Sequence, residues 1–528
     1  MAEWEEVDAL VITWAGFQGI CKQIVRHALP ECRVIIVCDD PDEVSNYLQG
    51  EEYGGPVTDL SAVTFITAAF NSIWARDYMA ESIYANEVDS LFLLDWIYNR
   101  PRPADDELSD VLGDSEDILV YSTTAAPFDL VHTGGNFMCD GAGTAFSSGL
   151  VLEENGSGGD FNQTVRDEAG VDAIMQQFMG IERYVKMPTL PYDGIHHIDM
   201  HMKLLDEETL LVGEFPVGVS DGPQLEENLS TVLAEHASIF GTPYKVVRVP
   251  MPPSTSGAHP PEASYRTYTN CVFINGTVLV PTYRTEYDTV GLRVLREQLP
   301  GYQVVGIDCD SEQNIILQSG ALHCITKTMG TRDPMLIRHQ PLADTYDAIN
   351  ERDVVAYIRH RSGIAGVTLH WATEREGPFT TVAMTISGTN EYTAAIPAHA
   401  SATTVYYYVE ATANNGKVLA RPMVAPAGSW SYRVLDVQSG LAEGPPMVEQ
   451  VFPNPTSSIL VVELAMNGGE QPTVELLDAL GRPVMRLHSG PLAADGRIFA
   501  DLSVLPPALY ELVIITRTGR TSRRVIKQ

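Results

Sequence analysis

The first 340 residues alternate between two hydrophobic patterns. Val7–Thr13 and Val34–Cys38 are short apolar runs, which are typical of buried strands. Asp40-Pro41 then predicts a short helix to about Leu48, because proline suits the first helical position and acidic residues suit the first turn. Three later stretches have the spacing of amphipathic helices: 167–179, 226–240 and 288–299. This alternation predicts an α/β fold.

Hairpins are expected between these helices. Met138–Phe146 and Met202–Val212 each have turn residues near their centre, and Cys271–Val280 contains Asn275-Gly276, the strongest short hairpin signal. The polar residues discussed below recur at steps of roughly 55 to 75 residues, which indicates a long-period repeat of hairpin, helix and strand. Equivalent positions of such units would converge on one axis and build a site from distant parts of the sequence.

The pattern changes after about residue 345. Residues 353–435 alternate apolar and polar side chains, as in Val367–Thr373, and turn signals separate the runs. The sequence therefore predicts an α/β catalytic domain at 1–345 and a β-sandwich at 346–437. A Gly- and Pro-rich linker at 438–447 and a second all-β domain at 448–528 are expected to follow.

Charge excludes some partners. The chain has 528 residues, and 69 acidic against 34 basic residues leave a net charge of −35. This field opposes nucleic acid and anionic membranes and favours cationic ligands, although a solvated charged surface is the commoner reason for such a balance. The absence of an apolar run of about 18 residues predicts no membrane span. The acidic first twenty residues do not resemble a secretory signal, so we expect either a cytoplasmic protein or a leader that has been removed.

One of the seven scattered cysteines stands out. No C-x-x-C motif is present, so neither a zinc ribbon nor a disulfide framework is indicated. Cys324, in Ser319–Thr326, follows a glycine-bearing turn and is expected at the start of a β-like apolar pair. A thiolate there would be a strong nucleophile.

His197, Asp199 and His201 are spaced by two and therefore predict one face of a strand, shared with Lys203. The other face would hold Ile198, Met200, Met202 and Leu204. A half-exposed strand with ordinary polar residues is one alternative. A metal site is another, since His-x-Asp-x-His can chelate, but no further ligand cluster supports it.

Asp77 follows Trp74-Ala-Arg76. It could simply pair with Arg76. It could also be a carboxylate beside an aromatic wall, which suits a flat cation, and Asp77 and Asp199 together could grip both edges of one guanidinium.

Arg100 and Arg102 each precede a proline, which predicts an extended rather than helical stretch. A rigid pair of cations suits an anion such as a carboxylate. The alternative is a stiff surface loop in which Asp105 and Asp106 answer the arginines.

Together these residues predict thiol chemistry on a guanidinium. Cys324 would attack the central carbon, Asp77 and Asp199 would hold the nitrogens, and His197 would act as general acid and base. The substrate supplies the electrophile, so we expect no metal and no organic cofactor.

The set resembles the guanidine-group-modifying superfamily, whose fold is a five-fold α/β-propeller. Within it, residues 7 to 335 resemble the Porphyromonas-type peptidylarginine deiminases. The resemblance rests on Trp74-x-Arg-Asp77, Gly134-Gly-Asn136, His197-x-Asp199, Asn270 and His323-Cys324-Ile-Thr326. It implies that Cys324 is the nucleophile, His197 the acid/base and Asp77 and Asp199 the guanidinium carboxylates, and that Asn270 lines the site.

Agmatine deiminases share this catalytic set. However, Asn99-Arg-Pro-Arg-Pro103 resembles the part of the peptidylarginine enzyme that grips a C-terminal carboxylate, which implies that Arg100 and Arg102 bind arginine-containing peptides or proteins. The stretch between Asn136 and His197, which includes 153–160, is longer than in the family pattern and is expected to reshape the rim of the cleft. Two other classes remain open: a propeller that has lost catalysis and an amidinotransferase.

The tail also carries a resemblance. The middle sandwich resembles an immunoglobulin-like domain, and the last 80 residues resemble the C-terminal sorting domain of the type IX secretion system of Bacteroidetes. Phe452-Pro-Asn-Pro455 and the basic end carry that match. It implies the secretion machinery as a partner and a protein that is secreted or held at the surface of a Gram-negative cell, with a leader already trimmed.

Overall fold

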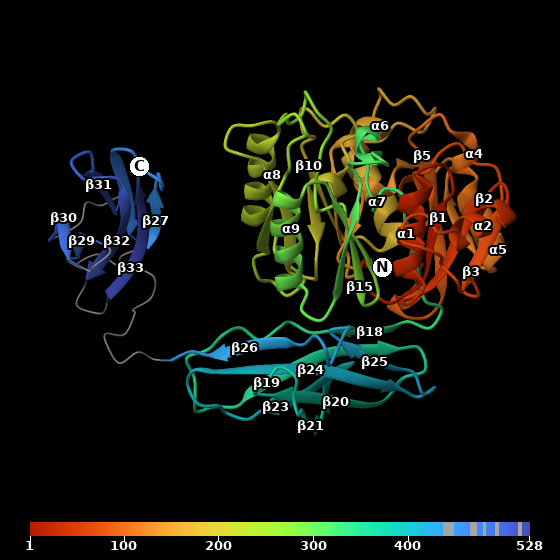
Figure 1. Cartoon of the computed structure of the whole chain (residues 1–528). Coiled ribbons are helices and arrows are strands. Elements are labelled where there is room, and N and C mark those ends of the chain that lie inside the picture. The colour runs from red at the N-terminus through yellow and green to blue at the C-terminus, as the bar shows by residue number, and fades with distance from the viewer. Residues whose placement is uncertain (437–447, 465–471, 479–481, 491–495, 516–519) are drawn as a thin grey trace. The chain divides into compact units, whose positions relative to one another are not determined.

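The computed structural model describes residues 1–436, 448–464, 472–478, 482–490, 496–515 and 520–528. The chain forms two compact units. The first comprises Met1–Ala343, Asn350–Ala398 and Thr404–Tyr432, and the second comprises the remaining segments, mainly Arg433–Gln528. Figure 1 shows helices and strands together in the first 340 residues and strands alone after them. No helix in the described part of the chain is long and apolar enough to cross a bilayer.

Five sheets make up the described α/β region, and each has the same local plan. An antiparallel pair is followed by a helix that crosses over to a parallel strand, for example β14–β15 antiparallel and β15–β16 parallel. The sheets are β17 (Lys327–Gly330), β1 (Val7–Thr13), β2 (Arg33–Cys38) and β3 (Val63–Thr67); β4 (Glu81–Tyr84), β5 (Leu91–Tyr98) and β6 (Val120–Thr123), with β7 (Val131–His132) beside β5; β8 (Met138–Cys139), β9 (Thr144–Ser148) and β10 (Arg183–Met187); β11 (Met202–Leu204), β12 (Thr209–Glu214) and β13 (Lys245–Pro250); and β14 (Val272–Ile274), β15 (Thr277–Thr282) and β16 (Gln303–Asp308). The α/β class and the three predicted hairpins are confirmed.

Strand β1 shows why its sequence is continuously apolar. Leu10 and Ile12 lie in one hydrophobic core, and Ala9 and Val11 lie in a second core on the other face. A strand that is buried on both faces needs no polar alternation.

The helices largely follow their sequence signals. The Asp40 side chain accepts hydrogen bonds from the backbone N–H groups of Asp42 and Glu43 and thereby starts α2. The predicted helix at 226–240 instead begins at Gly222, with Pro223 in its first turn, and ends at Glu235. The helices are α1 (Gln18–Ala28), α2 (Pro41–Gln49), α3 (Ala75–Tyr78), α4 (Pro103–Asp106), α5 (Leu108–Glu116), α6 (Leu150–Asn155), α7 (Glu168–Met179), α8 (Gly222–Glu235) and α9 (Thr285–Gln298), with 3₁₀ turns η1 (Ala85–Glu87), η2 (Gly134–Asn136), η3 (Ile198–Met200) and η4 (Ile315–Gln318).

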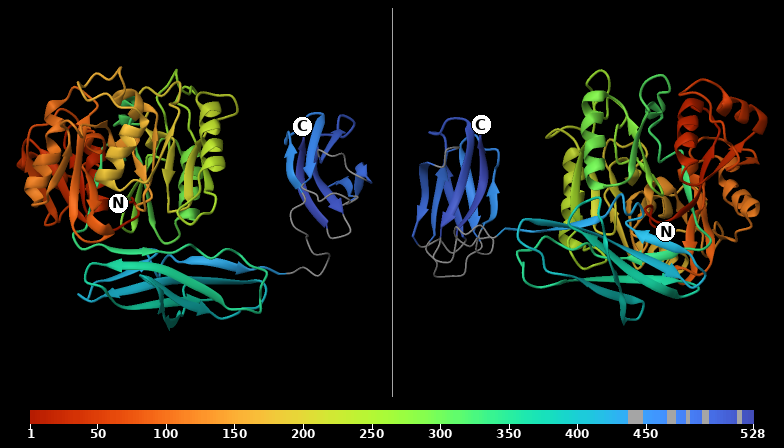
Figure 2. Two further views of the ribbon diagram at one scale, coloured as in Figure 1. Left: turned by 180° about the vertical axis from the view of Figure 1, so that it is seen from behind. Right: turned by 60° about the horizontal axis from the view of Figure 1, so that its bottom comes forward.

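The expected β-sandwich follows. One sheet contains β18 (Met335–Arg338), β19 (Arg352–His360), β23 (Glu391–Ile396) and β22 (Thr385–Gly388), and the other contains β21 (Thr380–Ala383), β20 (Ile364–Ala372), β24 (Thr403–Ala413) and β25 (Val418–Arg421), with β26 (Trp430–Val434) near the end of the sandwich. Figure 2 shows these strands from two further sides.

The second unit contains the last β module. Its sheets are β27 (Val448–Phe452), β28 (Ile459–Leu464) and β31 (Arg497–Asp501), and β30 (Pro483–Ser489), β29 (Thr473–Leu477), β32 (Ala508–Ile515) and β33 (Arg520–Lys527). Apolar side chains from both sheets share one core, so the predicted second all-β sandwich is present. The side chain of Asn454, in the Phe-Pro-Asn-Pro motif, bonds to the backbone of Arg524 and Ile526. The predicted linker at 438–447 lies outside the described residues.

Candidate active site

Side chains from widely separated parts of the sequence meet around Cys324. Asn270 Nδ2 lies 3.2 Å from Cys324 Sγ, and Asp199 Oδ2 lies 3.6 Å from the same sulfur. All three side chains are buried; Cys324 is 2% exposed. The structure therefore brings the predicted nucleophile together with two of its predicted partners.

Cys324 lies in a turn, and the expectation that it starts a strand is wrong: β17 begins three residues later, at Lys327. Backbone contacts fix this turn. The Arg76 N–H donates to the carbonyl of Cys324 over 3.1 Å, and the His323 N–H donates to Oδ1 of Asn270 over 3.0 Å. The amide nitrogen of Asn270 thus contacts the sulfur, and its amide oxygen accepts the N–H of His323.

Asp77 and His197 form a second pair in the site. Nδ1 of His197 lies 3.5 Å from Oδ1 of Asp77, and that oxygen also accepts the Gly135 N–H over 3.2 Å. Arg76 instead donates from Nε to the carbonyl of His323, so the suggested pairing of Asp77 with Arg76 is wrong. Neither ring nitrogen of His197 has a hydrogen-bond partner within the described chain.

The Gly-Gly-Asn motif makes room for this pair. A Cβ on Gly134 would lie 2.0 Å from the carbonyl oxygen of Arg76, and one on Gly135 would lie 2.5 Å from Nδ1 of His197. Asn136 accepts the N–H of Ser148 over 2.8 Å and so fixes the end of β9. Its contacts are structural, while the glycines set the spacing of the acid/base pair.

The predicted strand face at 197–203 is wrong. Residues 198–200 form the 3₁₀ turn η3, and β11 begins only at Met202. His197, Asp199, His201 and Lys203 are all buried, as are the apolar residues between them, so the half-exposed strand is wrong as well. Asp199 and Lys203 are inside because each has an ionic partner, His323 and Glu3 respectively, and not because they share an exposed face.

The metal alternative finds no support in the geometry of these residues. Among the residues that the structure describes, no group of three His, Cys, Asp or Glu side chains is arranged to hold a metal ion. Burial lowers the pKa of His201 to about 4, so this imidazole is neutral.

The two site carboxylates have pKa values shifted in opposite directions. Burial raises the pKa of Asp77, and the charge of His197 offsets this only in part. Burial also acts to raise the pKa of Asp199, but the hydrogen bond and charge of His323 outweigh it and hold that pKa below its ordinary value. Asp199 is therefore the more readily ionised member of the two.

The thiol is neutral in the unliganded site. Burial raises the pKa of Cys324 well above its ordinary value, and the charges of Asp199 and Asp77 raise it further. The sulfur therefore needs either a nearby cation or a base before it can act as a thiolate.

Arg100 and Arg102 form no ion pair in the described chain. An Arg102 N–H donates to the Tyr98 hydroxyl over 3.1 Å, and an Arg100 N–H donates to the carbonyl of Asn99 over 2.9 Å. The charge of Arg100 acts on Asp77, which places it within electrostatic reach of the carboxylates.

Asp105 and Asp106 do not answer these arginines. Asp105 accepts bonds from the backbone of Asn71 and Ser72 and from the Ser72 hydroxyl, and Asp106 accepts the N–H of Tyr98. The expected pairing of Arg100 and Arg102 with Asp105 and Asp106 is therefore wrong. The expectation that the whole stretch avoids helix is also wrong, because α4 begins at Pro103, where proline is favoured at the first helical position.

Trp74 lies beside the nucleophile. A Cβ on Gly320 would meet the Trp74 ring at 2.3 Å and the Cβ of Cys324 at 3.1 Å. The indole, the glycine and the cysteine are therefore closely packed, as expected for an aromatic wall.

Three site residues were not found from the sequence: Glu3, Glu154 and His323. Asn99 donates to Oε1 of Glu154 over 2.7 Å, while Oε2 of Glu154 is buried without a hydrogen bond in the described chain. Burial raises the pKa of Glu154 to about 7, and the charges of His197 and Arg100 act on it. Glu154 lies in the 153–160 stretch, so the departure from the family pattern was the one signal that pointed to it.

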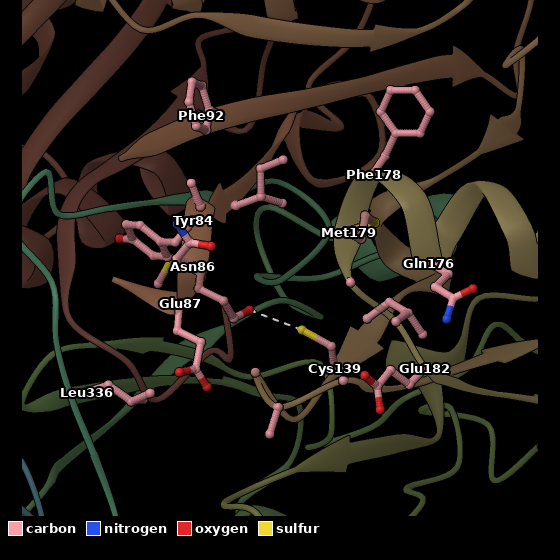
Figure 3. A pocket seen from close by; sticks show the side chains of 18 of the residues that line it. Tyr84, Asn86, Glu87, Phe92, Cys139, Gln176, Phe178, Met179, Glu182 and Leu336 are labelled. Atoms are coloured by element: carbon pink, nitrogen blue, oxygen red, sulfur yellow. Dashed lines mark hydrogen bonds between the residues drawn. The ribbon is translucent and has the colours of Figure 1, made fainter. Parts of the chain in front are cut away.

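A separate cavity of about 680 Å³ contains none of the predicted site residues. Figure 3 shows its wall, with Phe92, Phe178, Glu87 and Cys139, whose sulfur donates to the carbonyl of Met1 over 3.1 Å. This cavity is therefore not the predicted site of thiol chemistry.

Two regions of the chain match known protein families. Residues 1–329 match the model of the Porphyromonas-type peptidyl-arginine deiminase family, and residues 450–528 match that of a secretion system C-terminal sorting domain. A Vibrio parahaemolyticus protein, provisionally named an agmatine deiminase, is 24% identical over 298 residues, which are 51% of this chain and 78% of that protein.

Solved structures share the fold. One from Porphyromonas gingivalis, provisionally named an arginine deiminase, is 23% identical with a TM-score of 0.53, and covers 62% of this chain and 97% of its own. A substituted C. jejuni agmatine deiminase with substrate bound is 18% identical with a TM-score of 0.51, and covers 63% and 96% of the two chains. The sorting domain indicates secretion or attachment to the cell surface. The chain belongs to the Porphyromonas-type peptidyl-arginine deiminase family and ends in a type IX C-terminal sorting domain.

Proposed function

We propose that this protein is a hydrolase that converts arginine at the C-terminus of peptides or proteins to citrulline and ammonia. The observation that carries the reaction is the meeting of Cys324 with Asn270 and Asp199, beside the Asp77–His197 pair. A thiol, two carboxylates and an imidazole with free nitrogens are the groups needed for nucleophilic substitution at a guanidinium carbon.

In the first half-reaction, a guanidinium cation binds between Asp77 and Asp199. The positive charge of the guanidinium offsets the negative charges of the two carboxylates, which otherwise raise the pKa of the Cys324 thiol. His197 then accepts the thiol proton as the sulfur attacks the central carbon. His197 returns that proton to the departing nitrogen. The C–N bond breaks, ammonia leaves and a covalent thiouronium remains on Cys324.

In the second half-reaction, His197 takes a proton from water, which adds to the same carbon. The C–S bond then breaks and the thiol is restored. The net change is guanidinium plus water to the neutral ureido product plus ammonium, so atoms and charge balance without a redox or metal partner. Trp74 walls the flat cation, and Asn270 orients the sulfur.

Arg100 and Arg102 support a substrate that carries a carboxylate. The charge of Arg100 acts on Asp77, Arg102 bonds to Ser72 and Tyr98, and neither arginine forms an ion pair in the described chain. A guanidinium binds a carboxylate strongly through paired N–H groups, so a C-terminal arginine would supply the missing anion.

Agmatine is the alternative substrate. Glu154 presents an unpartnered oxygen near Arg100 and His197, and an ionised Glu154 would suit the ammonium end of agmatine. The Vibrio relative carries the corresponding name. Because burial raises the pKa of Glu154 to about 7, the side chain is only partly ionised at neutral pH, which weakens this alternative.

The same proposal extends to architecture and location. We infer that the five sheets surround one pseudo-fivefold axis, so that residues at equivalent places in each sheet converge on Cys324. The domain boundaries at 345, 437 and 447 stay a prediction from the sequence. The protein would act outside the cell after export through the type IX machinery.

Formation of ureido product from three substrates tests the function. They are a peptide ending in arginine, the same peptide with its terminal carboxylate amidated, and agmatine. Activity confined to the first supports the proposal, and preference for agmatine supports the alternative. Cys324→Ala should abolish turnover, whereas Cys32→Ala, which removes a free and partly buried thiol that is not a predicted site residue, should not. Turnover by Cys324→Ala would refute the nucleophile.

A further inference from the structure

His323, the residue before the nucleophile, lies between two carboxylates. Its Nδ1 is 2.7 Å from Oδ2 of Asp199, and its Nε2 is 2.6 Å from Oε1 of Glu3. The ring is 1% exposed, so water does not compete for these contacts. An ionised carboxylate only accepts hydrogen bonds, so the ring can serve both only when both nitrogens carry a hydrogen.

The series of alternating charges continues on the far side of Glu3. Nζ of Lys203 lies 2.7 Å from Oε2 of Glu3. Although burial acts to raise the pKa of Glu3, the charges of His323 and Lys203 hold it well below its ordinary value. The pKa values of both carboxylates that face His323 are thus held below their ordinary values, and the ring can donate a hydrogen bond to each of them only as an imidazolium.

We propose that Glu3 and His323 are positioning residues whose charged pair holds Asp199 ionised and directed at the substrate cation. This proposal rests on the proposed function, in which Asp199 binds the guanidinium. The two oxygens of the Asp199 carboxylate have different contacts. Oδ2 contacts His323 and Cys324, while Oδ1 has no hydrogen-bond partner in the described chain. The free oxygen is the one left for substrate.

The other groups around Asp199 cannot replace His323. His197 and Lys203 act on it by charge alone, and Asp77 is a like charge in the same buried space. A buried carboxylate beside another carboxylate takes up a proton unless a cation is hydrogen-bonded to it. Without the imidazolium, Asp199 would therefore be protonated at a higher pH and would lose its hold on a cation.

Alkylation of Cys324 by two similar reagents tests this without relying on turnover. Chloroacetamidine is a cation that needs an ionised Asp199, whereas chloroacetamide is its neutral counterpart. Glu3→Gln and His323→Asn keep neutral hydrogen-bonding groups but remove the charges. The control is Glu208→Gln, which changes a more deeply buried carboxylate that pairs with Lys245 and, in the described chain, has no hydrogen bond or ion pair with Asp199, His323 or Glu3.

We expect both variants to slow the chloroacetamidine reaction about 10- to 100-fold, the loss typical of one charge-assisted hydrogen bond. The chloroacetamide reaction should not slow by more than about twofold, and the acid limb of the chloroacetamidine rate should move to higher pH. Equal slowing with both reagents, or unchanged selectivity, would overturn the proposal and leave His323 a structural residue. If His323→Asn fails to fold, as judged by thermal unfolding, Glu3→Gln carries the test alone.

The outcomes also separate this proposal from the proposed function. Wild-type protein that prefers chloroacetamidine but turns over no guanidinium substrate would refute the function. The effect of Glu3→Gln on that preference would still decide the role of the charged pair.

Discussion

Replacing Gly135 by alanine should separate the acid/base pair without touching a charged group. The added Cβ would lie 2.5 Å from Nδ1 of His197 and 2.7 Å from Oδ1 of Asp77. Ordinary contact begins near 3.4 Å, so the imidazole must move by about 0.9 Å and the carboxylate by about 0.7 Å. These shifts would widen a pair whose atoms are now 3.5 Å apart.

The energetic consequences differ for folding and for catalysis. Overpacking of a buried site costs about 1–3 kcal/mol, which a protein of this size should survive. A displacement of about 1 Å in a reacting group costs about 100-fold in rate, because the bound geometry is no longer close to that of attack. We therefore expect kcat/KM for a peptide ending in arginine to fall at least about 100-fold while the protein remains folded.

The assay is steady-state ureido formation, with thermal unfolding measured on the same samples. Gly158→Ala is the matched control, because no atom lies within 4 Å of its added Cβ and its backbone is not in the left-handed region. If Gly135→Ala kept activity within about threefold of wild type, then His197 and Asp77 would not form the working pair.

Three further changes test substrate choice and domain roles. Replacing Arg100 and Arg102 together by alanine should raise KM for a C-terminal arginine about 10-fold or more and leave agmatine little changed; equal losses would show that the arginines are structural. As pH rises through about 7, Glu154 ionises, so KM should rise for the carboxylate-bearing peptide and fall for agmatine, and Glu154→Gln should flatten both profiles. Ending the chain before residue 437 should leave kcat/KM within about twofold, since no proposed site residue lies beyond that point; a large loss would give the tail a part in the site.

The sequence predicts what local chemistry controls. Continuous apolar runs mark strands buried on both faces, and Asn275-Gly276 marks its hairpin because Asn275 adopts a positive φ of 48°. Asp40 and Asp167 mark the starts of α2 and α7 because their side chains accept backbone N–H groups there. These signals need no knowledge of the rest of the fold.

The alternation of apolar and polar residues gave a wrong prediction where every residue is buried. The alternation at 197–203 predicts a strand only if one face meets solvent, but every residue from 197 to 205 is buried. Polar residues can be inside there because partners from elsewhere neutralise them. Glu3 and His323 are 320 positions apart, and Asn99 and Glu154 are 55 apart, so neither contact leaves a local pattern in the sequence.

The carboxylates that bind the substrate also restrain the nucleophile, and this gives one substitution two opposite effects. After burial, the charge of Asp199 is the largest cause that raises the pKa of the Cys324 thiol. Asp199→Asn should therefore lower that pKa and speed alkylation of Cys324 by neutral chloroacetamide at neutral pH, since the rate follows the thiolate fraction. The same change removes the ionised anchor for guanidinium, so turnover of arginine peptides should fall by at least about 100-fold. Rates of alkylation and turnover measured on one preparation would check both signs. If Asp199→Asn slowed both reactions, Asp199 would not restrain the thiol, and activation of Cys324 would not depend on the arrival of a substrate cation.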